Sequence, residues 1–260
     1  MSKTWKHLFS RSKPKGKILF RGKKLEVFLR DGYRGFYFKD APRLIQGWQC
    51  VTDPHDFRSE FVELQAACAM AAPRLRRVAV LGLGVGTIPR TLQLVSPPVR
   101  IESVEIEPEV LDIAQSWFGL QTSERLKVSV GDARQWVQGQ REGRYDLVTM
   151  DCFDGNGLSA ACRDPQFFDQ LRRIVNPRGL ITFNLIKGRP ENRVVHRELS
   201  RITKGCWAIP GQRKSNLAVF GSPGQRLRIE ECVLRAGSVD RRRCLPFRMS
   251  PHVKRMERWT

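Results

Sequence analysis

The feature that most restricts the fold of this chain is an apolar run that ends in three closely spaced glycines, at residues 78–87 (VAVLGLGVGT). An apolar strand that runs through a glycine turn into a helix presents backbone N–H groups to a ligand, because glycine has no Cβ to keep the ligand away. Thr87 stands where a pyrophosphate-binding turn has its last glycine. The spacing of Gly82, Gly84 and Gly86 therefore favours a nucleoside ligand without phosphates.

Acidic residues follow the next three apolar runs of the chain. Glu105, Asp132 and Asp151 each lie at or just after the end of such a run, and helix-compatible segments separate them. In a parallel sheet these strand ends meet at one edge. Glu105 comes about twenty residues after the glycines, which is the spacing of an acid that accepts hydrogen bonds from both hydroxyls of a ribose. The sequence therefore predicts a nucleoside-binding site.

The alternation of apolar runs and helix-compatible segments predicts an α/β fold. We expect its strands at 78–82, 100–104, 126–130, 145–150, 179–184, 206–209 and 216–221. Upstream, short apolar runs alternate with Arg-Gly and Asp-Gly turn signals, which is typical of β-hairpins. The expected organisation is a basic segment and small β-hairpin domain at 1–56, a Rossmann-like catalytic domain at 57–223 and a basic tail at 224–260.

The central segments resemble the spermidine synthase-like branch of class I S-adenosylmethionine-dependent transferases. Residues 104–118 (VEIEPEVLDIAQSWF) are similar to its V-E-I-D-P block, and residues 151–157 (DCFDGNG) to its D-x-x-D-x-x-G loop. Fainter similarities occur at 47–50 (GWQC) and 61–64 (FVEL). The branch contains methyltransferases and aminopropyltransferases. The resemblance implies a seven-stranded methyltransferase sheet and a homodimer. Because the sequence has neither a long apolar run nor the apolar region of a secretory signal, we expect a cytoplasmic enzyme.

The resemblance also implies a cofactor site for S-adenosylmethionine or its decarboxylated form. Its expected residues are Gly82, Gly84, Gly86, Glu105, Asp132, Ala133 and Gln49. Asp132 and Ala133 would contact the adenine, although Gly131 and Asp132 fit a turn and a helix N-cap equally well. Trp117 or Phe118 would pack near the adenine or in the core.

Asp151 and Asp154 are the candidate catalytic residues. Methyl and aminopropyl transfer both displace a carbon next to a sulfonium, so the nucleophile must be held in line and, if it is an amine, must be unprotonated. A carboxylate at a strand end can accept or orient the amine proton. We assign that role to Asp151, with Asp154 as an orienting group, a partner of a substrate ammonium, or a cap of the following loop.

Two differences from the family's pattern bear on the reaction. Aminopropyltransferases carry an acid in the glycine turn, where it pairs with the aminopropyl ammonium, and this chain has Val85. The tyrosine of the family's Y-x-E motif is Phe61 here. Both differences favour methyl transfer. The alternatives are a spermidine synthase-type aminopropyltransferase, and a catalytically inactive nucleic-acid-binding protein on the same scaffold.

The charge of the chain bears on its partners. The formal net charge is +20, with Lys and Arg concentrated near both termini. Such a surface attracts an acidic macromolecule or nucleic acid, or is only a solvated basic coat. It also disfavours a free polyamine as the acceptor. The seven cysteines form no C-x-x-C pair, no metal site is indicated, and no apolar run is long enough for a membrane span.

Overall fold

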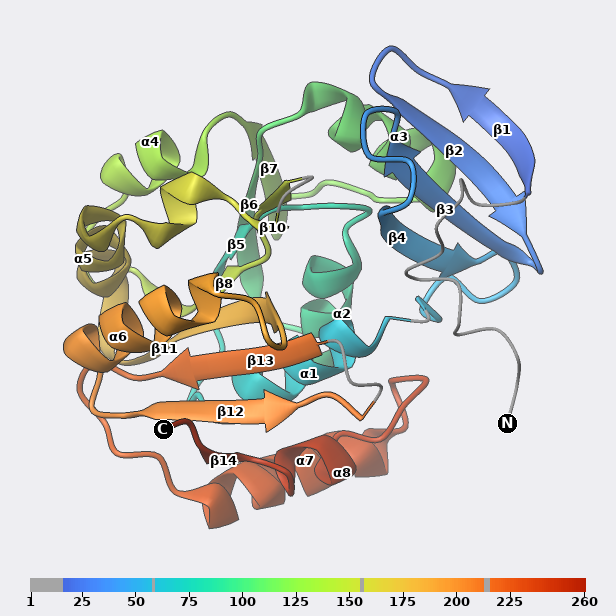
Figure 1. Ribbon diagram of the computed structural model, residues 1–260. Coiled ribbons are helices and arrows are strands. Elements are labelled where there is room, and N and C mark those ends of the chain that lie inside the picture. The colour runs from blue at the N-terminus through green and yellow to red at the C-terminus, as the bar shows by residue number, and fades with distance from the viewer. Residues whose placement is uncertain (1–15, 58, 155–156, 213–215) are drawn as a thin grey trace.

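The computed structural model describes residues 16–57, 59–154, 157–212 and 216–260. Within them, the central feature is an eight-stranded sheet with strand order β14-β12-β13-β11-β8-β5-β6-β7 (Figure 1). Its strands are β5 (Arg77–Leu81), β6 (Arg100–Glu105), β7 (Leu126–Val130), β8 (Tyr145–Met150), β11 (Val175–Ile186), β12 (Cys206–Pro210), β13 (Asn216–Gly221) and β14 (Glu257–Arg258). The first five run parallel, and the last three form an antiparallel edge. The α/β fold is confirmed, with β14 as an eighth strand beside the seven predicted.

The central parallel strands are mostly apolar because helices cover both faces of the sheet. On β5, Val78 and Val80 face one buried cluster, and Ala79 and Leu81 face the other. The helices are α1 (Glu60–Ala69), α2 (Thr87–Val95), α3 (Pro108–Phe118), α4 (Ala133–Gln138), α5 (Pro165–Ile174), α6 (Glu191–Ile202), α7 (Ile229–Arg242) and α8 (Ser250–Val253). The first cluster includes side chains of α1, α2, α7 and α8, and the second includes side chains of α4, α5 and α6.

A separate four-stranded antiparallel sheet precedes the α/β unit and lies beside α3 (Figure 1). Its strands are β1 (Lys17–Arg21), β2 (Leu25–Arg30), β3 (Tyr33–Phe38) and β4 (Ile45–Cys50). The predicted hairpins are therefore confirmed. The β2–β3 turn places Asp31 and Gly32 at positive φ, as its Asp-Gly sequence favours.

Polar contacts fasten this N-terminal sheet to the α/β unit. Gln49 Nε2 donates hydrogen bonds to the carbonyls of Pro54 and Phe118, each at 3.1 Å. The guanidinium of Arg90 donates to the same two carbonyls, each at 2.9 Å. At the β1–β2 turn, the Glu109 carboxylate at the start of α3 accepts from backbone N–H groups. The N-terminal sheet is thus fixed at both ends of α3.

Residues 224–260, which we expected from the sequence to form a basic tail, are folded against the core. Helices α7 and α8 lie together at one side of the molecule (Figure 1), and β14 pairs with β12. Cys232, Ala236 and Val239 of α7 are buried in the cluster that α1 also joins. The basic side chains of this segment therefore surround an apolar stripe with helical spacing.

Candidate functional site

The glycine turn follows β5 and leads into α2. Gly82, Gly84 and Gly86 have φ angles of 94°, 53° and 77°, in the region that favours glycine. A Cβ at position 82 would lie 2.4 Å from the Asp151 carbonyl oxygen, and one at position 86 would lie 2.5 Å from Leu120 Cδ1. Conformation and close packing therefore both require glycine at positions 82 and 86.

The carboxylate of Glu105 faces this turn from the end of β6. It accepts hydrogen bonds from the backbone N–H groups of Leu83 at 3.0 Å, Gly84 at 3.4 Å and Glu107 at 3.0 Å. The side chain is buried, and this burial raises the pKa of Glu105 although the backbone hydrogen bonds oppose the shift. The glycine turn and the acid that the sequence predicted as a ribose ligand thus lie in direct contact.

Two exposed apolar side chains lie next to Glu105, and the sequence analysis did not include them. Ile106 follows the acid and is 68% exposed, and Val130 ends β7 and is 50% exposed. The two strand ends are adjacent, since Gly131 N–H donates to the Glu105 carbonyl at 2.8 Å. Exposed apolar side chains beside a polar cluster are typical of a ligand-binding surface. An apolar residue directly after a strand-ending acid was the available signal in the sequence.

Asp132 begins α4 as its N-cap. Its Oδ1 accepts hydrogen bonds from the backbone N–H groups of Arg134 at 2.8 Å and Gln135 at 3.1 Å. Ala133 is the first residue of the helix. The capping alternative is therefore present in the structure, and a contact of Asp132 and Ala133 with adenine stays a prediction.

Asp151 follows β8 and is paired with an asparagine of the neighbouring strand. Asn184 Nδ2 donates to Asp151 Oδ1 at 2.8 Å, and Asn184 Oδ1 accepts from Asn216 Nδ2 at 3.1 Å. Burial raises the pKa of Asp151 to about 6, the Asn184 hydrogen bond lowers it, and the negative charge of Glu105 raises it. The two predicted acids therefore share one site.

Asn184 and Asn216 were missed by the sequence analysis. Asn184 interrupts the apolar run 180–186 (LITFNLI), and a polar residue in a doubly covered strand was a usable signal. The contact of Asn216 with Asn184 has no local signal, because the pairing of β13 with β11 creates it.

The loop after Asp151 forms a small hairpin in which β9 (Phe153–Asp154) pairs with β10 (Gly157–Leu158). The backbone of Asp154 opposes that of Gly157. The Asp154 side chain lies outside the described part of the structure, so its role stays a prediction.

The remaining predicted residues lie where the N-terminal sheet meets α3. Gln49 is buried in the carbonyl contacts described above, and its cofactor role stays a prediction. Val85, where aminopropyltransferases carry an acid, is buried in an apolar cluster with Phe36 and Phe118. Phe118 packs edge-on against Phe36, with ring centroids 6.2 Å apart. Of its two possible roles, packing in the core is the one that the structure describes.

Among the described residues, no group of three or more His, Cys, Asp or Glu side chains is arranged to hold a metal ion. None of the described helices has the length and apolar character that crossing a membrane requires.

Solved structures of known proteins share this fold. A probable spermidine synthase from Corynebacterium glutamicum superposes with a TM-score of 0.70 at 20% identity, over 88% of this chain and 87% of the other. Human methyltransferase-like protein 13, solved in complex with SAH, superposes with a TM-score of 0.60 at 22% identity, over 77% of this chain and 94% of the other.

Curated relatives include both kinds of transferase. A polyamine aminopropyltransferase of Vibrio vulnificus is 29% identical over 136 residues, which are 51% of this chain and 46% of the relative. An eEF1A lysine and N-terminal methyltransferase of Danio rerio is 34% identical over 118 residues, which are 42% of this chain and 17% of the relative. The chain thus matches less than half the length of these relatives. The model of the spermine/spermidine synthase domain matches residues 63–204, more than half of the chain, and the protein therefore belongs to the spermine/spermidine synthase domain family.

Proposed function

We propose that the protein is an S-adenosylmethionine-dependent transferase and, within that class, a methyltransferase. The observation that carries the proposal is the meeting of two groups at one sheet edge. Glu105 with the glycine turn forms one group, and Asp151 with Asn184 forms the other. The charge of Glu105 adds to the effect of burial in raising the pKa of Asp151.

The first group fits the nucleoside and methionine parts of the cofactor. Each carboxylate oxygen of Glu105 can accept more than one hydrogen bond, so ribose hydroxyls can bind beside the backbone donors. Ile106 and Val130 supply apolar surface for the adenine ring, which explains their exposure. One structural relative was solved with SAH, and a spermidine synthase relative with the transition-state analogue AdoDATO, which supports a ligand of this type.

The distinction between methyl and aminopropyl transfer rests on Val85. Names of relatives do not decide it, since they include an aminopropyltransferase and a methyltransferase. An aminopropyl ammonium needs a carboxylate partner, whereas Val85 is 1% exposed within an apolar cluster. Placing an ammonium against that cluster would leave a charge without a partner. The intact cofactor carries a carboxylate beside its ammonium, which offsets that charge, and is therefore the better ligand.

The second group supplies the acceptor chemistry. When bound, S-adenosylmethionine supplies a methyl group on a sulfonium, which leaves as a neutral thioether. Asp151 holds the acceptor amine in line and takes up the proton that the amine loses as its bond to carbon forms. Asn184 fixes the Asp151 carboxylate through its amide and leaves the second carboxylate oxygen available. With a pKa of about 6, Asp151 is largely ionised at neutral pH.

Calorimetric titration with three ligands tests the proposal. We expect S-adenosylmethionine and S-adenosylhomocysteine to bind, and decarboxylated S-adenosylmethionine to bind no more tightly than the intact form. Selective binding of the decarboxylated form, together with production of spermidine from putrescine, would establish the aminopropyltransferase instead. Failure of all three ligands to bind would leave the inactive nucleic-acid-binding scaffold.

A further inference from the structure

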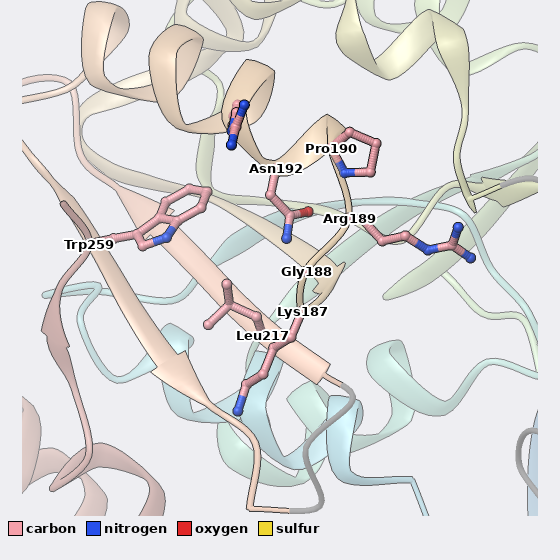
Figure 2. Close-up of a pocket in the computed structure, with 8 residues that line it drawn as sticks. Lys187, Gly188, Arg189, Pro190, Asn192, Leu217 and Trp259 are labelled. Atoms are coloured by element: carbon pink, nitrogen blue, oxygen red, sulfur yellow. The ribbon is translucent and has the colours of Figure 1, made fainter.

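A second concave site lies at the carboxyl end of β11, where the chain turns into α6. It is an open pocket of about 510 Å³ between this turn, β13 and Trp259 (Figure 2). In Figure 2, Trp259 and Arg189 lie at opposite sides of the pocket, with Leu217 and Asn192 between them. No part of the proposed cofactor site lines it.

The pocket is cationic. Lys187, Arg189 and Arg193 line it, and no acidic residue does. Lys187 Nζ donates to the Gly211 carbonyl at 2.8 Å, which leaves its charge uncompensated. Within the described residues, neither Arg189 nor Arg193 forms an ion pair, and both side chains are exposed. The field at this site therefore attracts an anion and repels a polyamine.

Trp259 and Leu217 supply an apolar wall, and Trp259 is held in place. The backbone N–H of Trp259 donates to the Cys206 carbonyl at 3.1 Å, and its carbonyl lies 3.0 Å from His196 Nε2. The His196 and Trp259 rings meet nearly at right angles, with centroids 4.8 Å apart. Leu217 of β13 continues the wall. An aromatic side chain fixed in this way is suited to stacking against a flat ring.

We infer that this pocket binds a nucleotide, with phosphate at Arg189 and the base against Trp259 and Leu217. Arginine matches phosphate oxygens in bidentate geometry, and stacking on an aromatic ring accepts any base. The volume is that of a pocket for a small organic ligand. An acidic peptide would satisfy the cations but would not use the indole wall. The nucleotide is either free or part of a single-stranded nucleic acid, which the net charge of +20 also attracts.

The pocket is near the proposed reaction centre but separate from it. Lys187 follows Asn184 by three residues, which is about 10 Å of extended chain. Binding there needs neither cofactor nor transfer, so it can be measured independently of the proposed function.

Equilibrium binding of 5′-UMP and of a short oligouridylate tests the inference. A pyrimidine probe, measured with S-adenosylhomocysteine in excess, avoids binding at the proposed adenosine site. We expect Arg189→Gln/Arg193→Gln to weaken both probes at least tenfold. The matched control is Arg74→Gln/Arg100→Gln, which removes two exposed arginines near the opposite edge of the sheet and should change affinity less than threefold.

A second variant tests the base wall. Trp259→Leu should weaken 5′-UMP roughly fivefold to a hundredfold, as loss of stacking does, and leave ribose 5-phosphate unchanged. Equal affinity for 5′-UMP and the oligomer would identify a free nucleotide, and tighter, more salt-dependent binding of the oligomer would identify a single strand.

The inference is overturned if neither probe binds, if polyglutamate binds as tightly as the oligomer, or if the double variant behaves like its control. Glu105→Ala keeps the two proposals distinct. It should lose S-adenosylhomocysteine affinity and keep 5′-UMP affinity, so failure at one site is visible without failure at the other.

Discussion

The Asp151 carboxyl group is held by one neighbouring amide and pushed toward its neutral form by its surroundings. Burial and the nearby charge of Glu105 raise its pKa, while the hydrogen bond from Asn184 stabilises the ionised form. Removal of that amide should therefore raise the pKa further. The pair thus offers a test at the scale of single residues.

We expect turnover on an identified acceptor to rise with pH through about 6, as Asp151 ionises. Asn184→Leu should move this rise to higher pH, because the leucine cannot donate a hydrogen bond to the carboxylate. Asp151→Asn should lower kcat far more than cofactor affinity. A pH–rate profile for each variant measures these effects, and an unchanged midpoint in Asn184→Leu would show that another group titrates.

The same shift predicts how stability depends on pH. The folded pKa of Asp151 lies above its ordinary value of 3.8, so the folded state binds more protons between about pH 4 and 6. The Asp151 contribution to the free energy of unfolding should therefore fall as pH rises through this window. Asp151→Asn should remove that fall, which urea denaturation at pH 4.5 and 7 would detect. Parallel curves for the two proteins would contradict the raised pKa.

Glu105→Ala should weaken S-adenosylmethionine binding roughly tenfold to a hundredfold, since buried hydroxyl donors would lose their acceptor. The matched control is Glu124→Ala, which removes an exposed acid from the turn before β7. Calorimetry compares the two variants. If they bind the cofactor equally well, the ribose assignment to Glu105 is wrong.

At the scale of elements, the glycine turn and the segment after β13 show what sequence can reveal. The turn was predictable because apolar runs and glycine spacing are local properties. Helix α7 was not predicted, although Cys232, Ala236 and Val239 are spaced at i, i+4 and i+7. The stripe was hard to recognise in the sequence because its residues are small or weakly apolar and lie among many arginines and glutamates. Its burial depends on contact with α8 and the covered face of the sheet.

Gly119 and Gly82 both have positive φ angles, but only at Gly82 would an added side chain collide with its surroundings. At Gly119, φ is 64° and a Cβ added there would have no atom within 4 Å, so Gly119→Ala should cost about 1–2 kcal/mol from backbone conformation alone. Gly82→Ala adds a collision with the Asp151 carbonyl and should cost clearly more. Urea denaturation gives both values, and equal losses would mean that the turn adjusts freely.

The C-terminal helices should contribute to global stability. Met249, at the start of α8, is fully buried, whereas Leu234 of α7 is 72% exposed. Met249→Ala should lower the free energy of unfolding by about 2–5 kcal/mol, and Leu234→Ala by less than about 0.5 kcal/mol. A Met249→Ala protein as stable as the parent would show that residues 224–260 act as an appendage.

For the whole molecule, the sequence predicted the positions of the strands along the chain and the edge at which the acids meet, since both follow from the apolar pattern and from the rules of parallel sheets. It did not predict the hydrogen bonds that join Asp151, Asn184 and Asn216, or the pocket beside Trp259. Both join residues from strands or segments far apart in the sequence. Long-range contacts of this kind depend on how three layers pack, and no local pattern records them.

The hydrogen bonds to the carbonyls of Pro54 and Phe118 limit which segments of this protein could be exchanged with those of a relative. Gln49 of the N-terminal sheet and Arg90 of α2 donate to the same two oxygens, and Val85 of the glycine turn is buried in a cluster with side chains from that sheet. The boundary near residue 56 therefore divides the chain but does not yield two exchangeable modules. A chimera that took its first fifty residues from another family member would have to import matching partners on α2 and α3 as well.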